Sequence, residues 1–325
     1  MNIQEITKSV EREGLLVHRI LSEMEKVVVG QRTLMERLLI GLLCDGHLLL
    51  EGLPGLGKTT AVKTLASVIK ASFQRIQFTP DLLPAGIIGS RIYRPDKGFE
   101  FKKGPIFHNI ILADQINRAP ASVQSALLEA MQERQVTIGR ETFLLERLFL
   151  VLATQNPIKE EGTYPLPWAQ IDRFMLKIKV DYPTLQEEKE IVERVNGSGR
   201  TDFLNVVEFS KLDSAKALVR EIRVEEKIMD YVLRLIRATR DPGKFGIEIG
   251  PYVSHGASPR GSIWLALAAR AHAFLKGRGY VTPWDVKTMA PDVLRHRIIL
   301  SDEADEKGKS VDKVIEILLE QMEVP

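Results

Sequence analysis

The sequence contains a single cysteine, Cys44, and no long apolar run. One cysteine excludes an intrachain disulfide and favours a reducing, cytoplasmic location. The N-terminal residues 1–8 are polar, so we expect no secretory signal peptide. No apolar stretch approaches the roughly 20 residues that a membrane-spanning helix needs. We therefore expect a soluble, cytoplasmic protein with no membrane span.

Charge and histidine content exclude further classes of protein. The net charge is only +2, which gives no global attraction to nucleic acid or to an anionic membrane. The six histidines are scattered without the spacing of metal ligands, and the lone cysteine gives no support for thiol catalysis. We expect no nucleic-acid partner and no histidine or cysteine metal centre.

Apolar segments alternate with helical patterns in the first part of the chain. After helical segments at 4–26 and 32–43, the predicted strands are 47–51, 73–78, 109–114, 148–154 and 174–180. Such alternation is typical of a parallel sheet covered by helices. Near Asp181-Tyr182-Pro183 the strands stop, and helical patterns follow at 184–195, 213–222, 224–240, 258–276, 283–297 and 308–322. The pattern predicts an α/β core over residues 1–182 and an all-α domain over residues 183–325.

A glycine-rich motif follows the first predicted strand and precedes a helix. The stretch Gly52-Leu53-Pro54-Gly55-Leu56-Gly57-Lys58-Thr59 fits the P-loop pattern G-x-x-x-x-G-K-[ST]. Glycines let the backbone surround a triphosphate, and the N–H groups at the start of the helix, which continues at Thr60, point toward it. Lys58 then reaches the phosphates and the Thr59 hydroxyl ligates Mg²⁺. The chain is therefore predicted to bind ATP or a related nucleoside triphosphate with Mg²⁺.

Polar residues end two later predicted strands. Asp114 closes the apolar run Asn109–Ala113, where a second Mg²⁺-coordinating side chain is needed. Asn156 follows the run 150–155, where an amide can orient the water that attacks the γ-phosphate. Alone, an Asn before a Pro is an ordinary turn residue, and its position after two phosphate-binding strands favours the functional interpretation.

Several motifs together resemble the MoxR family of AAA+ ATPases. They are Gly52–Thr59, IILADQINRAP at 110–120, ALLEAMQE at 126–133, ATQNP at 153–157, GTYPLP at 162–167, IDRF at 171–174 and GASPRG at 256–261. The resemblance spans nearly the whole chain. It implies that the helical part is the lid domain and that subunits assemble into a ring, commonly a hexamer.

The resemblance also implies roles for individual residues. Asn156 matches the sensor 1 residue, and Arg260 matches sensor 2, which touches the γ-phosphate from the lid. Arg173 matches the arginine finger, which reaches the nucleotide of a neighbouring subunit; such a guanidinium contributes about 10³–10⁵ in rate. Val29-Gly30-Gln31 matches the segment that contacts the adenine edge.

Two segments resemble insertions of this branch of AAA+ proteins. Residues 91–106 have alternating Phe99 and Phe101, and residues 135–147 read as a β-hairpin turning near Gly139-Arg140. Contact with a substrate in the central pore and packing between subunits are equally consistent with these hairpins.

Two residues depart from the family pattern. Position 115 is Gln, where the family has the Glu that polarises the attacking water. An amide has no basic site, and losing general-base assistance costs about 10²–10⁴ in rate. The substitution is consistent with an engineered ATP-trapping change or with a naturally slow member. Trp168 stands where the family usually has an acid, near Arg173 and the expected subunit interface.

The leading functional prediction is an ATPase that uses ATP binding and Mg²⁺-dependent hydrolysis to remodel or assemble protein complexes, with turnover slowed by Gln115. The resemblance implies partners with von Willebrand factor A domains and client protein complexes. A nucleotide-binding switch or scaffold with little turnover is the alternative that Gln115 motivates. A nucleic-acid motor is a third, weakly supported because Lys102-Lys103 and Arg140 are sparse positive charges.

Overall fold

The computed structural model describes residues 2–96, 98–156, 163–196 and 211–325. They form two compact units, which we call the sheet unit (Arg19–Phe174 and Ile178–Lys211) and the helical unit (Met1–His18, Met175–Lys177 and Leu212–Pro325). Neither unit is one continuous segment. The division into domains at residue 182 stays a prediction.

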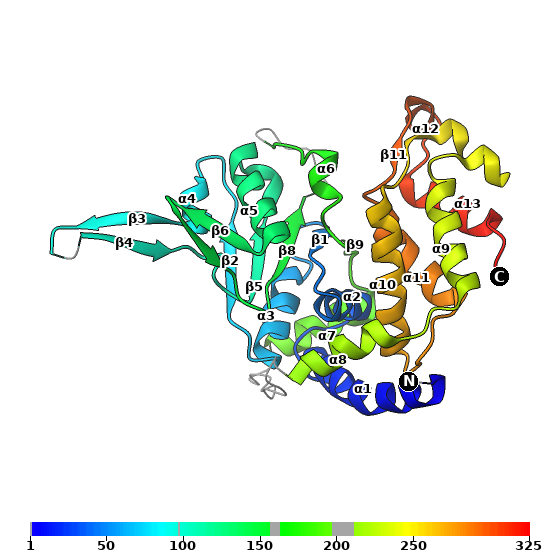
Figure 1. Ribbon diagram of the computed structural model, residues 1–325, viewed down its shortest axis with the longest axis horizontal. Helices are drawn as coiled ribbons and strands as arrows, with labels where there is room; N and C mark the ends of the chain where they lie inside the picture. The colour runs from blue at the N-terminus through cyan, green and yellow to red at the C-terminus, as the bar shows by residue number, and fades with distance from the viewer. Residues whose placement is uncertain (1, 97, 157–162, 197–210) are drawn as a thin grey trace. The chain divides into compact units, whose positions relative to one another are not determined.

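The sheet unit contains a five-stranded sheet in the order β2-β5-β8-β1-β9 (Figure 1). Its strands are β1 (Leu48–Glu51), β2 (Phe73–Gln77), β5 (Ile110–Asp114), β8 (Leu150–Gln155) and β9 (Leu176–Lys179). The pairs β2–β5, β5–β8 and β8–β1 are parallel. All five strands lie at the predicted positions, so the predicted α/β core is confirmed.

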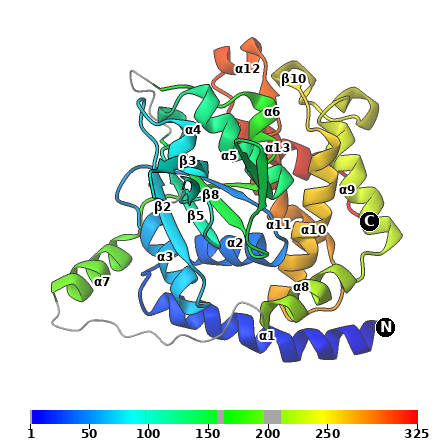
Figure 2. The same ribbon diagram turned by 60° about the vertical axis from the view of Figure 1, so that its left-hand side comes forward.

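Helices cover both faces of this sheet (Figures 1 and 2). On one face, Ile111 of β5 and Val151 of β8 pack in a core cluster with Leu127 of α5 (Ala121–Glu133). On the other face, α2 (Arg32–Leu43) approaches so closely that a Cβ on Gly41 would lie 2.8 Å from the Leu48 side chain. The remaining helices of this unit are α3 (Lys58–Val68), α4 (Pro84–Ile88), the 3₁₀ turn η1 (Ile116–Arg118), α6 (Trp168–Ile171) and α7 (Leu185–Asn196).

Two β-hairpins are attached to the sheet unit. One pairs β3 (Gly89–Arg94) with β4 (Gly98–Lys103), and Figure 1 shows it projecting away from the sheet. The other pairs β6 (Gln135–Ile138) with β7 (Glu141–Leu144). Its turn includes Gly139, whose φ of +68° suits glycine. Both predicted hairpins are therefore confirmed.

The helical unit consists mainly of the predicted helices. They are the first part of α1 (Ile3–Glu25), α8 (Leu212–Glu221), α9 (Glu226–Ala238), α10 (Pro259–Leu275), α11 (Pro283–Leu294) and α13 (Val311–Gln321). The short helix α12 (Asp302–Glu306) and the 3₁₀ turns η3 (Pro242–Phe245) and η4 (Gly250–Tyr252) were not predicted. No helix in the described part of the chain combines the length and the apolar character needed to cross a bilayer.

The prediction that strands stop after residue 182 is wrong in one place. Strand β10 (Val253–His255) pairs antiparallel with β11 (Ile299–Leu300) in a two-stranded ribbon. Neither segment is long enough to show the alternating pattern of a strand. Their pairing joins segments far apart in the chain, so no local signal could have predicted it.

A buried ionic cluster stabilises the helical unit around Asp285 in α11. Asp285 is fully buried, and its carboxylate accepts hydrogen bonds from Arg278 Nη1 (2.8 Å), Arg278 Nη2 (2.6 Å) and Thr282 Oγ1 (2.7 Å). His272 Nδ1 lies 2.6 Å from the same carboxylate. Burial raises the pKa of Asp285, but the hydrogen bonds from His272, Arg278 and Thr282 outweigh it and hold the pKa well below its usual range.

We expect Asp285→Asn to lower the free energy of unfolding by about 3 kcal/mol at neutral pH, because it leaves the buried side of Arg278 without a carboxylate. Since the pKa of Asp285 is lowered on folding, its contribution is complete above the usual aspartate pKa. It is lost as the pH falls toward the lowered value, so the two proteins converge only in strong acid. Urea unfolding followed by circular dichroism measures the difference, with Asp302→Asn as the control. Equal stability of Asp285→Asn and the parent at pH 7 would contradict the prediction.

Candidate functional site

The predicted P-loop connects β1 to α3, as a phosphate-binding loop requires. Gly55 and Gly57 have φ values of +88° and +75°, which side chains larger than glycine adopt only under strain. Gly52 passes so close to Val180 that a Cβ would lie 2.6 Å from its carbonyl oxygen. Helix α3 begins at Lys58, so its free N–H groups face the loop.

Lys58 is folded back over the loop. Its Nζ donates hydrogen bonds to the carbonyl oxygens of Gly52 (2.8 Å) and Leu53 (2.6 Å). Partial burial lowers the pKa of Lys58 below its ordinary value, and the charge of Asp114 opposes this shift. The ammonium group is therefore held at the loop, where phosphate oxygens can replace these carbonyl acceptors.

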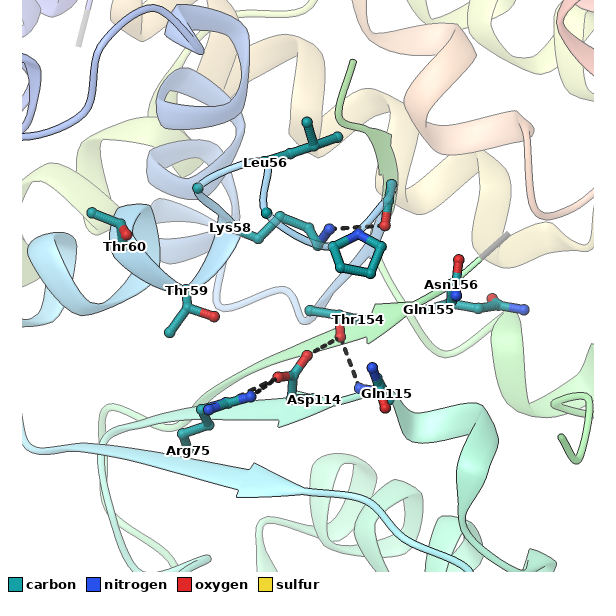
Figure 3. Close-up of a pocket in the computed structure, with 14 residues that line it drawn as sticks. Leu56, Lys58, Thr59, Thr60, Arg75, Asp114, Gln115, Thr154, Gln155 and Asn156 are labelled. Carbon is teal, nitrogen blue, oxygen red and sulfur yellow. Dashed lines mark hydrogen bonds and ion pairs between the residues drawn. The ribbon is translucent and has the colours of Figure 1, made fainter. Parts of the chain in front are cut away.

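Asp114 ends β5 beside residues from both neighbouring strands (Figure 3). Thr154 of β8 donates its hydroxyl proton to Oδ1 over 2.6 Å. Arg75 of β2 donates to Oδ2 from Nε (2.9 Å) and Nη2 (2.5 Å). The parallel pairing of β2, β5 and β8 brings the side chains of Arg75 and Thr154 within hydrogen-bond distance of Asp114.

Gln115 follows Asp114 with a left-handed backbone, φ +57°. Its N–H donates to Thr154 Oγ1 over 2.8 Å, and its side-chain oxygen accepts from Gln77 Nε2 and Arg118 Nη1, each at 3.2 Å. These contacts hold both the backbone and the amide of the residue at the position where a catalytic carboxylate is expected.

One pocket of about 330 Å³ joins the P-loop to the ends of β5 and β8. It contains the predicted residues Gly52, Pro54, Gly55, Leu56, Gly57, Lys58, Thr59, Thr60, Asp114, Gln115 and Asn156, together with Arg75, Thr154 and Gln155. The fold thus gathers segments from distant parts of the sequence, as predicted for phosphate binding. Pro157 and Gly162 of the quoted motifs lie outside the described residues.

A second, mainly apolar pocket of about 290 Å³ shares the tip of the P-loop. Of the three predicted adenine-contacting residues, Val29 and Gln31 line it, and Gly30 lines an adjacent hollow. Gln31 Nε2 donates to the carbonyl of Asp181 over 2.9 Å, which attaches this segment to the chain after β9. The size and the apolar lining of this second pocket suit the flat base of a nucleotide whose phosphates occupy the first pocket.

Sequence reasoning missed several residues of these pockets. They are Arg75, Thr154 and Gln155 in the first pocket, and Val27, Val28, Pro183, Ile191, Arg194 and Val195 in the second. Ile191 and Val195 are four residues apart on α7, a spacing that places them on one helix face. That spacing indicated an apolar helix face, but not what the face would cover.

Arg173 is not among the described residues that line the phosphate pocket. Its Nη1 donates to the carbonyl of Leu128 over 3.0 Å, and its buried Nε has no hydrogen-bond partner in the described part of the chain. Trp168, which begins the short helix α6, is partly exposed. An arginine outside its own pocket suits the predicted action on a neighbouring subunit.

Arg260 lies in the helical unit, at the second position of α10. Ser258 caps this helix, and its hydroxyl oxygen accepts a hydrogen bond from the backbone N–H of Arg260 over 3.2 Å. The sensor 2 role stays a prediction, as do the roles of Asn156 and Arg173.

The donor set near Asp114 fits Mg²⁺ in a nucleotide complex. In the described ranges, no group of three or more His, Cys, Asp or Glu side chains could hold a metal by itself. Mg²⁺ in phosphate sites uses one or two carboxylates and takes its remaining ligands from phosphates and water. Asp114 and the Thr59 hydroxyl, which both line the pocket, would supply that protein share.

Comparison with known proteins agrees with this geometry. Residues 47–176 match the model for the ATPase family associated with various cellular activities (AAA), and residues 248–318 match an AAA lid domain. Chaperone MoxR1 of Mycobacterium tuberculosis is 47% identical over 95% of this chain and 82% of its own length. YeaC of Bacillus subtilis is 41% identical over 95% of both chains.

Solved structures also include a similar protein. A crystal structure described as an ATPase from Cytophaga hutchinsonii has a TM-score of 0.92 and 46% identity, and the match covers 99% of this chain and 98% of that one. Protein MoxR of Methylorubrum extorquens is 31% identical over 87% of each chain. The chain therefore belongs to the MoxR family of AAA ATPases.

Proposed function

We propose that this protein binds ATP with Mg²⁺ and uses binding and slow hydrolysis to remodel or assemble protein complexes. The observation that carries the proposal is the single pocket containing Lys58, Thr59, Asp114 and Gln115, with an apolar pocket directly beside it. Phosphates and base of one nucleotide would occupy the two adjoining spaces.

The residues of the site have different roles in this proposed function. The backbone N–H groups of the P-loop and Lys58 bind the phosphates, while Thr59 and Asp114 hold Mg²⁺, which screens the phosphate charge when bound. Thr154 orients Asp114 and the backbone of residue 115 through the same hydroxyl group. Asn156 and Gln115 orient the attacking water, and Arg260 contacts the γ-phosphate from the lid.

Gln115 slows the chemical step in this proposal. Its amide can orient water but cannot accept the proton that a carboxylate would take. The P-loop and Asp114 do not depend on this side chain, so ATP affinity is retained. The amide at position 115 also favours a second candidate function, a nucleotide-dependent switch or scaffold whose ATP-bound state is long-lived.

The partners in this proposal are other subunits and client proteins. We propose a homo-oligomeric ring in which Arg173 acts on the nucleotide of a neighbouring subunit. We also propose a client-handling role, consistent with the chaperone name of the Mycobacterium tuberculosis relative. A partner with a von Willebrand factor A domain is part of the same proposal. The projecting β3–β4 hairpin exposes Tyr93 and Phe99, side chains suited to contacting either a client or a neighbouring subunit.

Lys58→Ala tests nucleotide binding directly. We expect it to weaken ATP binding in the presence of Mg²⁺ by about tenfold to a hundredfold, because it removes charge-assisted hydrogen bonds to the phosphates. Isothermal titration calorimetry measures the affinity, and Lys63→Ala, at an exposed position of the same helix, is the matched control. ATP affinity equal in Lys58→Ala and the parent would refute the proposed site.

A further inference from the structure

Arg75 has no role in the function proposed above, yet it makes the closest charged contact in the phosphate pocket. Its guanidinium directs two N–H groups, Nε and Nη2, at one oxygen of Asp114, at 2.9 and 2.5 Å. The Arg75 side chain is half exposed, whereas that of Asp114 is only 15% exposed. The arginine is therefore the more solvent-accessible partner of this ion pair.

Both carboxylate oxygens of Asp114 are engaged in this arrangement. Thr154 donates to Oδ1 and Arg75 donates to Oδ2 (Figure 3). Mg²⁺ requires near-octahedral geometry with oxygen ligands at about 2.0–2.1 Å. A guanidinium and a divalent cation close to the same oxygen repel each other, so Arg75 and Mg²⁺ compete for Asp114.

Arg75 also decides the charge of the pocket. Among the described lining residues, only Lys58, Arg75 and Asp114 are charged side chains. Without Arg75, the carboxylate of Asp114 would offset Lys58 and repel a phosphate chain that arrives without metal. With Arg75 in place, the pocket keeps a surplus positive charge.

The sheet also provides Arg75 with an alternative acceptor. Arg75 Nη2 lies 2.6 Å from the side-chain oxygen of Gln77, which is on the same strand. Gln77 is directly opposite Asp114 in the β2–β5 pairing. The guanidinium can thus release Asp114 and keep a hydrogen bond to Gln77.

We propose that Arg75 is a built-in counter-cation for Asp114, which neutralises the carboxylate in the metal-free pocket and must leave Oδ2 before Mg²⁺ binds there. This inference rests on the proposed function, since it concerns how the nucleotide site accepts its metal. Arg75 thereby sets how strongly nucleotide affinity depends on Mg²⁺.

The test compares Arg75→Gln with the parent protein by calorimetric titration with the non-hydrolysable ATP analogue AMP-PNP. Affinity is measured once with Mg²⁺ and once with excess EDTA. We expect the ratio of the EDTA Kd to the Mg²⁺ Kd to rise by about threefold to tenfold in Arg75→Gln, the range of one charge-assisted contact that is partly exposed. Arg75→Lys keeps the charge but loses the paired donors, so its ratio should lie between the two.

Two controls connect the effect to Asp114. Arg94→Gln removes an arginine that pairs with Glu100 on the distant hairpin, and it should leave the ratio unchanged. In an Asp114→Asn background, Arg75→Gln should alter the ratio less than in the parent background, because the carboxylate for which Arg75 and Mg²⁺ compete is absent.

The possible results separate this inference from the function on which it rests. An unchanged ratio in Arg75→Gln, with normal binding by the parent, would overturn the inference and leave the proposed function intact. An equal loss of affinity with and without Mg²⁺ would also overturn it and would make Arg75 a direct phosphate ligand. Failure of the parent to bind AMP-PNP under either condition would overturn the proposed function and this inference together.

Discussion

Replacing Gln115 with glutamate is expected to raise steady-state ATP hydrolysis by about 100-fold or more. The two side chains have nearly the same shape, and the position is already fixed by Thr154 and by the donors Gln77 and Arg118. A carboxylate placed there gains a basic site for the attacking water and keeps the hydrogen bonds that orient it. The barrier should fall by roughly 3 kcal/mol or more.

Phosphate release at saturating ATP and Mg²⁺ measures this gain, with ATP affinity determined for both proteins. Gln155→Glu is the matched control, because it places the same new charge elsewhere in the same pocket. Similar turnover in Gln115→Glu and the parent, with tight binding in both, would show that residue 115 does not activate water. Absence of hydrolysis in both would favour the switch or scaffold function.

In the Gln115→Glu background, Arg173→Ala is expected to reduce hydrolysis by about 10³-fold while leaving ATP affinity intact. Arg173 lies outside the phosphate pocket of its own subunit and donates to the carbonyl of Leu128. In the described part of the chain its buried Nε has no hydrogen-bond partner, and we expect the guanidinium to act on a nucleotide bound by a second subunit. The loss of hydrolysis in Arg173→Ala should therefore occur only where two subunits are in contact.

Mixed assemblies test this requirement. Subunits with Arg173→Ala keep an intact P-loop, and subunits with Lys58→Ala keep the arginine, so mixing the two should restore part of the activity at shared interfaces. Arg12→Ala, which removes an exposed arginine of α1, is the control and should retain full activity. Mixtures no more active than the separate variants would exclude action between subunits.

Trp168 lies close to Arg173 in the sequence and begins α6. It is partly exposed in the isolated chain, as a residue at a subunit contact would be. Sedimentation of the Arg173→Ala and parent proteins with nucleotide would separate a loss of assembly from a loss of chemistry.

Local patterns predicted most of the sheet unit correctly. The three central strands β1, β5 and β8 are short apolar runs whose side chains are buried on both faces of the sheet, and such runs are visible without any tertiary information. The P-loop was equally visible because its glycines, lysine and threonine must be neighbours in the chain. The ribbon of β10 and β11 was missed because its strands are too short to carry a pattern.

The residues of the site likewise fall into those that local sequence patterns predicted and those that depend on tertiary contacts. Lys58, Thr59, Asp114 and Asn156 were predicted because each occupies a set position at the end of a strand or the start of a helix. Arg75 was not, because a charged residue in the middle of FQRIQ resembles any solvent-exposed strand residue. Its contact with Asp114 depends on the pairing of β2 with β5, which residue spacing does not encode.

By itself, the sequence determined the family, the α/β core, the phosphate-binding loop and the unusual amide at position 115, since each depends on residues adjacent in the chain. Only the tertiary structure decided that Arg75 pairs with Asp114 and that α7 forms a wall of the second pocket. The reason is physical: strand order and helix docking bring together groups from distant segments, and the energies of those contacts arise only after the chain has folded.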